Sequence, residues 1–219
     1  MSSPKDRELF DALTQDLRPV RRAPAFAVAL SAVLGVALLC GVALRDRLGP
    51  LETLWQQILG EPLYAAVLLA LLIAGVAGSV AAVASSAPDR SRLATQGSRV
   101  AWASLGLAVV GCSIGVGLTP DPSALGAAVH ASCFVFSVAV ALVPGAALAF
   151  CTMRGWVARP SQAASAALVG VLALGAVLVH LQCAALEPAH FLLGHLTAPV
   201  ALSALGLVPL AALLRRFAR

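Results

Sequence analysis

The sequence predicts an all-α protein, a polytopic membrane helical bundle with six transmembrane helices and with both termini in the cytoplasm. Of the 219 residues, 60% are hydrophobic and only 11% are charged, whereas soluble domains contain about 25% charged residues. Six apolar stretches contain no Lys, Arg, Asp or Glu, and each is close to or above the length of about 20 residues that a spanning helix needs. These stretches are Ala25–Leu44, Leu63–Ala84, Val100–Leu118, Ala124–Phe150, Ala163–Cys183 and Phe191–Leu214.

The polar residues 1–24 precede the first span and are predicted to form a cytoplasmic tail. A helix that ends before Pro19 would collect the apolar residues of the tail on one narrow face: Leu9, Phe10, Leu13 and Leu17. The acidic residues occupy much of its remaining surface: Asp6, Glu8, Asp11 and Asp16. A helix this short is marginal alone in water, so we expect it to dock on a partner, or else to lie on the bilayer surface or remain disordered. The four acids disfavour an anionic bilayer, where cations on the polar face are expected.

The loop after the first span is predicted to contain an interfacial helix on the outer face. Turn residues bound it at Gly49-Pro50 and at Gly60-Glu61-Pro62. Between them, apolar residues recur at helical spacing: Leu51, Leu54, Trp55, Ile58 and Leu59. Trp55 would lie at the level of the lipid headgroups, where tryptophan is enriched.

The remaining spans fix the predicted orientation of the transmembrane domain, residues 25–214. The fourth and sixth spans are long, so we expect a tilt or a bend at Pro144, Pro199 or Pro209. With the N-terminus inside, thirteen of the fifteen Lys and Arg residues lie on the inner side, and only Arg45 and Arg47 lie outside. The positive-inside rule therefore places the tail and the basic residues 215–219 in the cytoplasm of a bacterium, with the spans in its inner membrane. The net charge of +5 reflects this orientation, so we expect the bilayer and not nucleic acid as a partner.

Several function classes are disfavoured by what the chain lacks. Pumps and ion carriers usually place ionisable residues inside the membrane, and the predicted spans contain no acidic or basic residue apart from histidine. The sequence also has no Walker loop, dinucleotide fingerprint, zincin helix or nucleophile elbow. We therefore predict that the protein is not an enzyme and needs no cofactor.

Histidine and cysteine residues gather near the outer ends of the last three spans. The candidate residues for chemistry there are His130, Cys133, His180, Cys183, His190 and His195. His130 precedes Cys133 by three positions, as His180 precedes Cys183, and this spacing places two side chains on one helix face. Imidazole and thiolate groups suit zinc, copper or cadmium, and two cysteines on packed spans can form a disulfide.

Three interpretations of this group remain open from the residues alone. In the first, the group senses a signal through metal binding or redox chemistry. In the second, each histidine anchors a helix end by bonding backbone carbonyls or headgroups. The third is a metal- or haem-binding redox protein, with axial ligands among His130, His180, His190 and His195. No compact motif such as Cys-x-x-Cys supplies four ligands, which argues against a structural zinc site.

Short stretches of this chain resemble the NrsF-type six-span membrane anti-sigma factors, and the topology is similar throughout. The stretches are Leu9-Phe10-Asp11-Ala12-Leu13, Asp16-Leu17-Arg18-Pro19-Val20, Leu44-Arg45-Asp46-Arg47-Leu48, His180-Leu181-Gln182-Cys183, Glu187-Pro188-Ala189-His190 and Gly194-His195. The chain is also similar in size and span number to the membrane anti-sigma factors that control light-induced carotenoid synthesis. The family commonly has proline after the second cysteine and tryptophan before the last histidine, where this chain has Ala184 and Gly194.

The resemblance implies a function and a partner. The cytoplasmic side would hold an extracytoplasmic-function sigma factor inactive at the membrane until a stress signal releases it. In this chain the candidate sigma-binding residues are Leu9, Phe10, Leu13, Asp16 and Leu17. Cys133 and Cys183 match the outer cysteine pair that the family ties to signal response, and singlet oxygen would be the trigger in a light-responsive member.

Overall fold

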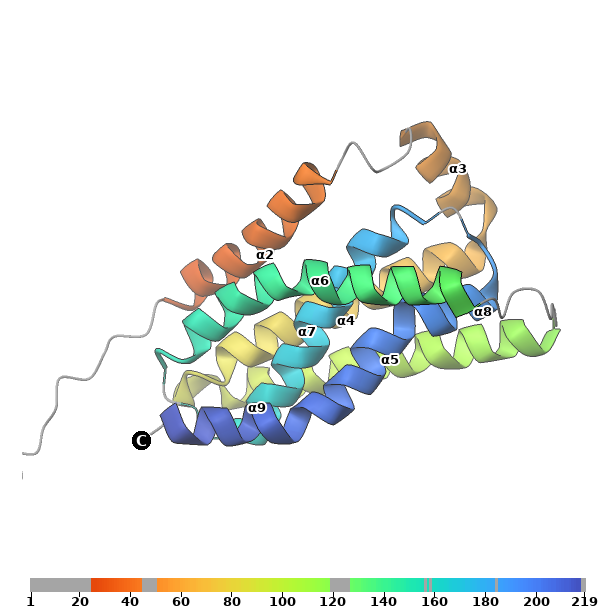
Figure 1. Ribbon diagram of the computed structural model, residues 1–219. Coiled ribbons are helices and arrows are strands. Elements are labelled where there is room, and N and C mark those ends of the chain that lie inside the picture. The colour runs from red at the N-terminus through yellow and green to blue at the C-terminus, as the bar shows by residue number, and fades with distance from the viewer. Residues whose placement is uncertain are drawn as a thin grey trace, which may run out of the picture.

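The computed structural model describes residues 25–44, 51–118, 127–155, 157, 159–183 and 185–217, which are mostly helical and contain no strand (Figure 1). The predicted tail helix and residues 45–50 lie outside this part of the chain. In chain order the elements are α2 (Phe26–Ala43), α3 (Leu51–Gly60), α4 (Pro62–Ala84), the 3-10 turn η2 (Pro88–Arg90), α5 (Ser91–Leu118), α6 (Ala127–Thr152), α7 (Pro160–His180), α8 (Pro188–His190), the π-helical segments η4 (Phe191–Leu196) and η5 (Ala198–Leu202), and α9 (Ser203–Phe217).

Six of these helical stretches are long and apolar enough to cross a membrane, which confirms the predicted all-α bundle. The second and fifth spans begin with Pro62 and Pro160, where the missing N–H of proline costs no helical hydrogen bond. The third span begins at Ser91, nine residues before the predicted start, because its first turns are polar and still helical. The sixth span is one continuous helical path, Pro188–Arg216, built from α8, η4, η5 and α9.

Helix α7 is the central element of the bundle. It packs against α4, α5, α6 and α9, and most of its residues are buried. Helix α2 packs at the periphery on α6 and α4 (Figure 1). Small residues allow the backbones of α4 and α7 to approach closely, since a Cβ added to Gly78 would lie 2.7 Å from Cα of Gly170. The glycine- and alanine-rich composition therefore determines how tightly the central helices pack.

The Gly78→Val variant should destabilise the bundle. Its Cβ would meet backbone atoms of Gly170 and the carbonyl oxygen of Ala166 at 2.8 Å, so α4 and α7 would have to move apart. Overpacking of this kind costs about 1–3 kcal/mol. Gly106→Val on α5 is the matched control, because nothing lies within 4 Å of a Cβ there. Thermal unfolding in detergent, followed by circular dichroism, should give a lower Tm for Gly78→Val alone; equal Tm values would contradict the close packing.

The bundle has two chemically distinct ends. We call the end formed by the close of α7, by α8 and by η4 the histidine end, because it contains His180, His190 and His195. The opposite end, which we call the arginine end, contains every arginine of the described residues: Arg90, Arg92, Arg99, Arg154, Arg159, Arg215 and Arg216.

Helix α3 confirms the helix predicted in the first loop. It packs on α4, and the Trp55 side chain is 55% exposed. In Figure 1, α3 and α8 lie toward the same end of the bundle, away from the marked C-terminus. The chain therefore places an amphipathic helix near the histidine end, as the topology requires.

Candidate functional site

Four potential metal ligands from separate parts of the chain meet at the histidine end. Cys133 lies on α6, Cys183 lies in the turn after α7, His190 ends α8, and His195 lies in η4. One ligand atom from each residue lies within 4.8 Å of each of the others. Sγ of Cys183 is 3.1 Å from Nε2 of His190. Both histidines are buried and both cysteines are half-buried, and we call these four residues the Cys–His cluster.

The end of α7 brings Cys183 into the cluster. The helix stops at His180, and the next residues form a turn in which the backbone N–H of Cys183 donates to the carbonyl of His180 at 3.3 Å. The prediction that His180 and Cys183 share one helix face is therefore wrong. The turn separates the two side chains, so that the thiol joins His190 while the imidazole of His180 faces α4.

The π-helical segment η4 explains how both histidines of the sixth span reach one site. In an α-helix, residues five apart point about 140° away from each other, whereas the wider π turn brings them closer to one face. The rings of His190 and His195 are accordingly 5.1 Å apart between centroids. Pro199 has no N–H to donate to the preceding turn, and the Thr197 hydroxyl donates to the carbonyl of Leu192, five residues back, at 3.0 Å. The structure thus widens the helix near Pro199, where the sequence predicts a bend.

Gly194 leaves the space in which the sixth span approaches α6. A Cβ at this position would lie 3.3 Å from Nε2 of His190, which is tighter than an ordinary contact, and 3.4 Å from Cβ of Cys133, at the limit of ordinary contact. A larger residue would push α6 and η4 apart. The sequence marked Gly194 only as a departure from the tryptophan that the family commonly has at this position, and assigned it no role in the site.

His180 lies beside the cluster and has a different role. Its Nε2 atom is 3.1 Å from the carbonyl oxygen of Tyr64, while the Tyr64 hydroxyl donates to the carbonyl of His180 at 2.8 Å. A carbonyl can only accept, so Nε2 carries the proton. The two rings are stacked with centroids 4.2 Å apart, and the ring of His195 meets His180 edge-on at 5.0 Å. His180 therefore anchors α7 to α4 and supports His195 from behind, as the helix-anchoring interpretation predicts for it.

The thiol of Cys183 is neutral at physiological pH. Burial raises the pKa of Cys183 to about 11, and the neighbouring Cys133 acts in the same direction. All five cysteines of the chain are free thiols in the structure, although Cys133 and Cys183 lie on elements that pack together. A metal ion or an oxidant would therefore have to displace a proton from Cys183.

The Cys–His cluster fits the donor set of a soft or borderline metal ion. With Zn–S bonds of about 2.3 Å and Zn–N bonds of about 2.0–2.1 Å, neighbouring ligand atoms in a tetrahedral site are about 3.3–3.8 Å apart. Atoms already within 4.8 Å of one another need to close by at most about 1.5 Å. The argument against a structural zinc site considered only compact local motifs, whereas these four potential ligands come from three helix ends.

Two groups of predicted site residues cannot be placed in this site. The sigma-binding candidates Leu9, Phe10, Leu13, Asp16 and Leu17 lie outside the described residues. His130 lies within α6, but its side chain is outside the described part of the chain. Tyr64, which the sequence analysis did not select, is the single tyrosine of the protein and is fully buried against His180.

Comparison with known proteins agrees with the sequence resemblance. A family model described as "Negative regulator of sigma F" matches residues 13–216, nearly the whole chain. No curated protein and no solved structure matches the chain. The matched family is one of sigma-factor regulators and not of enzymes, and its description implies a sigma factor as partner. With a match of this extent and six helices that can span a membrane, the chain belongs to the NrsF family, the negative regulators of sigma F.

Proposed function

We propose that the protein is an anti-sigma factor of the bacterial inner membrane that holds an extracytoplasmic-function sigma factor inactive and releases it on a stress signal. The observation that carries this proposal is the family match over residues 13–216, which includes part of the apolar face of the tail and all six spans. Sequestration at the membrane would keep the sigma factor away from RNA polymerase, and release would start transcription of its genes.

The tail, residues 1–24, is the proposed sigma-binding segment. Leu9, Phe10, Leu13 and Leu17 would dock into a groove of the sigma factor, with Asp16 at the edge of the contact. The acids of the tail would face basic surfaces that the sigma factor otherwise presents to nucleic acid. Charge complementarity of this kind speeds encounter and fixes the register of the bound helix.

Arginine placement supports the orientation that this function needs. All arginines of the described residues lie at one end of the bundle, which the positive-inside rule assigns to the cytoplasm. The histidine end then faces the outer compartment. A stress signal would reach the Cys–His cluster from outside, and the tail would act on the inside.

The signal supported best by the geometry is a thiophilic metal ion such as Zn²⁺ or Cd²⁺. Cys133 and Cys183 would supply thiolates, and His190 and His195 would supply neutral imidazole nitrogens. A bound metal ion would hold these four ligands together through coordination bonds. The ligands would draw α6, the turn after α7 and η4 together, and the arginine ends of the same helices would shift with them.

Oxidation is the second signal that the cluster could report. Joining the sulfurs of Cys133 and Cys183 removes one hydrogen from each thiol, and singlet oxygen would take up both as hydrogen peroxide. A disulfide and a four-ligand metal site would exclude each other, because both use the same two sulfurs. With light as the stress, the sigma factor would control carotenoid synthesis, as the resemblance implies.

In the alternative function, the protein is a metal- or haem-binding redox protein and not an anti-sigma factor. This alternative rests on the same four residues. Haem binding is less favoured, because the histidine rings already contact one another. The ring centroid of His195 is 5.0 Å from that of His180 and 5.1 Å from that of His190. A porphyrin would have to separate them. An absorbance spectrum of the purified protein distinguishes the two functions: a stoichiometric Soret band would favour the redox protein over the anti-sigma factor.

Zinc affinity should rise steeply with pH. Burial holds the pKa of Cys183 at about 11, so this thiol is protonated between pH 6 and 8 and must lose its proton to bind the metal. Each proton released strengthens the apparent affinity by about tenfold per pH unit. Competition with a chromophoric zinc chelator at pH 6.5 and 7.5 should therefore show a Kd at least about tenfold lower at the higher pH. A Kd that does not change would show that Cys183 is not a ligand.

Transcription in cells tests the proposed function itself. Deleting the gene should raise expression from promoters of the partner sigma factor, and overproducing the protein should silence them. The sigma factor should move from the membrane fraction to the soluble fraction on deletion. A sigma factor that stays soluble in the presence of the protein would contradict membrane sequestration.

A further inference from the structure

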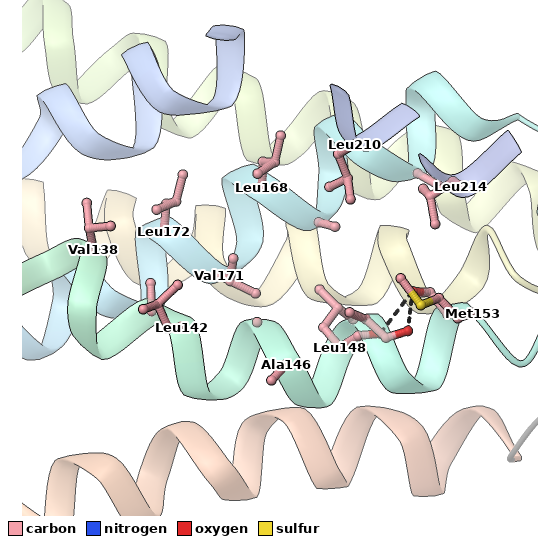
Figure 2. Close-up of a pocket in the computed structure, with 16 residues that line it drawn as sticks. Val138, Leu142, Ala146, Leu148, Met153, Leu168, Val171, Leu172, Leu210 and Leu214 are labelled. Carbon is pink, nitrogen blue, oxygen red and sulfur yellow. Dashed lines mark hydrogen bonds between the residues drawn. The ribbon is translucent and has the colours of Figure 1, made fainter. Parts of the chain in front are cut away.

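A hydrophobic groove opens between α6, α7 and α9, away from the Cys–His cluster. Helix α6 contacts the sixth span mainly at η4, and beyond that segment the sixth span packs on α7 instead. The two helices thus form the walls of a cavity of about 420 Å³ whose floor is α7. Figure 2 shows Leu142, Ala146 and Leu148 of α6 on one side and Leu210 and Leu214 of α9 on the other.

The lining of this groove accepts hydrocarbon and little else. Apart from the thioether of Met153, its single polar side chain is Thr152. The Thr152 hydroxyl already donates to the backbone, with the carbonyls of Leu148 and Ala149 at 3.0 and 3.1 Å, and both contacts are drawn in Figure 2. An extended peptide in the groove would bury backbone N–H and C=O groups without partners, at a cost of several kcal/mol each. An alkyl chain has no such groups.

The groove is longer than the hydrocarbon thickness of one leaflet of a bilayer. On α6 the lining runs from Val138 to Met153, which is about 22 Å at the helical rise of 1.5 Å per residue. Half of the hydrocarbon core is about 15 Å thick. The groove is therefore long enough to hold the whole length of one acyl chain from one leaflet.

The charge at the arginine end specifies the headgroup. Arg154 directly follows the lining residue Met153, and Arg215 directly follows the lining residue Leu214. Both arginines are exposed, and the sequence from Met153 to the C-terminus contains Glu187 as its single acidic residue, at the histidine end. Basic residues between spanning helices bind anionic lipid headgroups, and a guanidinium fits a phosphate with two parallel hydrogen bonds.

We propose that the groove between α6, α7 and α9 binds one acyl chain of an anionic phospholipid, whose phosphate headgroup is held by Arg154 and Arg215. The bound lipid would fill the space between α6 and the sixth span, the two walls that meet at the Cys–His cluster. This binding site is independent of the sigma partner and of the signal that the cluster receives.

Native mass spectrometry of the full chain tests the proposal. The protein would be purified in detergent and mixed with phosphatidylglycerol or with phosphatidylcholine of the same acyl chains. We expect one phosphatidylglycerol to be retained with roughly thirtyfold preference, since two arginines near an anionic headgroup each contribute on the order of 1 kcal/mol. Arg154→Gln/Arg215→Gln should lose this preference, and Arg99→Gln, an exposed arginine elsewhere at the arginine end, should keep it.

Filling the groove provides the second arm of the test. Ala146 is exposed in the groove, so Ala146→Phe should abolish retention of the lipid, while Ala103→Phe on the exposed face of α5 should leave it unchanged. Equal retention of both lipids, or equal behaviour of the two phenylalanine variants, would overturn the proposal. A dimer lost in Ala146→Phe, with no lipid in the wild type, would show that a second copy of the chain occupies the groove and would also overturn it.

Discussion

The double variant Leu13→Asp/Leu17→Asp should release the sigma factor from the membrane and switch its genes on without any stress. The two leucines are four residues apart on the apolar face of the predicted tail helix. Burying a leucine contributes about 1.5–3 kcal/mol, and a carboxylate in its place adds a desolvation cost. Affinity for the sigma factor should therefore fall at least about 100-fold, which cell fractionation and a promoter reporter would both detect.

A charge-matched variant separates docking from simple repulsion. Ala12→Asp/Gln15→Asp adds the same two charges away from the apolar face, so it should leave the sigma factor bound and the reporter silent. If both double variants released the sigma factor equally, net charge would be the cause. If neither did, the tail would not be the binding segment, and the inner loops would have to take that role.

Removing one ligand of the Cys–His cluster should abolish the response to the metal signal, while the protein still binds the sigma factor. Cys183→Ser and His195→Gln each remove one of the four converging ligand atoms. Removing a residue that only hydrogen-bonds to a metal ligand lowers metal affinity about 10–100-fold. Removing a ligand itself should lower zinc or cadmium affinity by more than this. The reporter should then stay silent when cadmium is added, although the tail is intact.

Cys40→Ser is the control for this experiment. Cys40 is a half-buried free thiol on α2 that is not part of the cluster. Wild-type metal affinity and a normal response are expected for this variant. A response lost in Cys40→Ser and kept in Cys183→Ser would assign the sensor to a different thiol and contradict the proposed role of the cluster.

Much of the fold follows from the sequence because the bilayer imposes simple rules. A charge-free stretch of about 20 residues has few structures available in a membrane, so the six spans could be predicted with small errors at their ends. The largest error, at the start of α5, arose because the helix extends into polar residues such as Arg92 and Arg99. Hydropathy detects the membrane-embedded part of a helix and not the turns beyond it.

The site could be predicted only in part. The sequence indicated that His180, Cys183, His190 and His195 lie near one end of the bundle, but not which of them meet. Two local features decided this: α7 stops at His180, and η4 widens into a π-helix. Neither follows from residue spacing, which assumes regular α-helical geometry. The contribution of Tyr64 depends on packing between α4 and α7, which are distant in sequence.

Co-purification of the sigma factor with the intact protein tests the central claim most directly. The tagged full-length chain would be captured from membranes in mild detergent and the bound proteins identified and quantified. We predict one sigma factor per captured chain, free of RNA polymerase core, and its loss from the Leu13→Asp/Leu17→Asp variant. Capture of the wild-type protein without any sigma factor, from cells that express one in the same operon, would contradict the account.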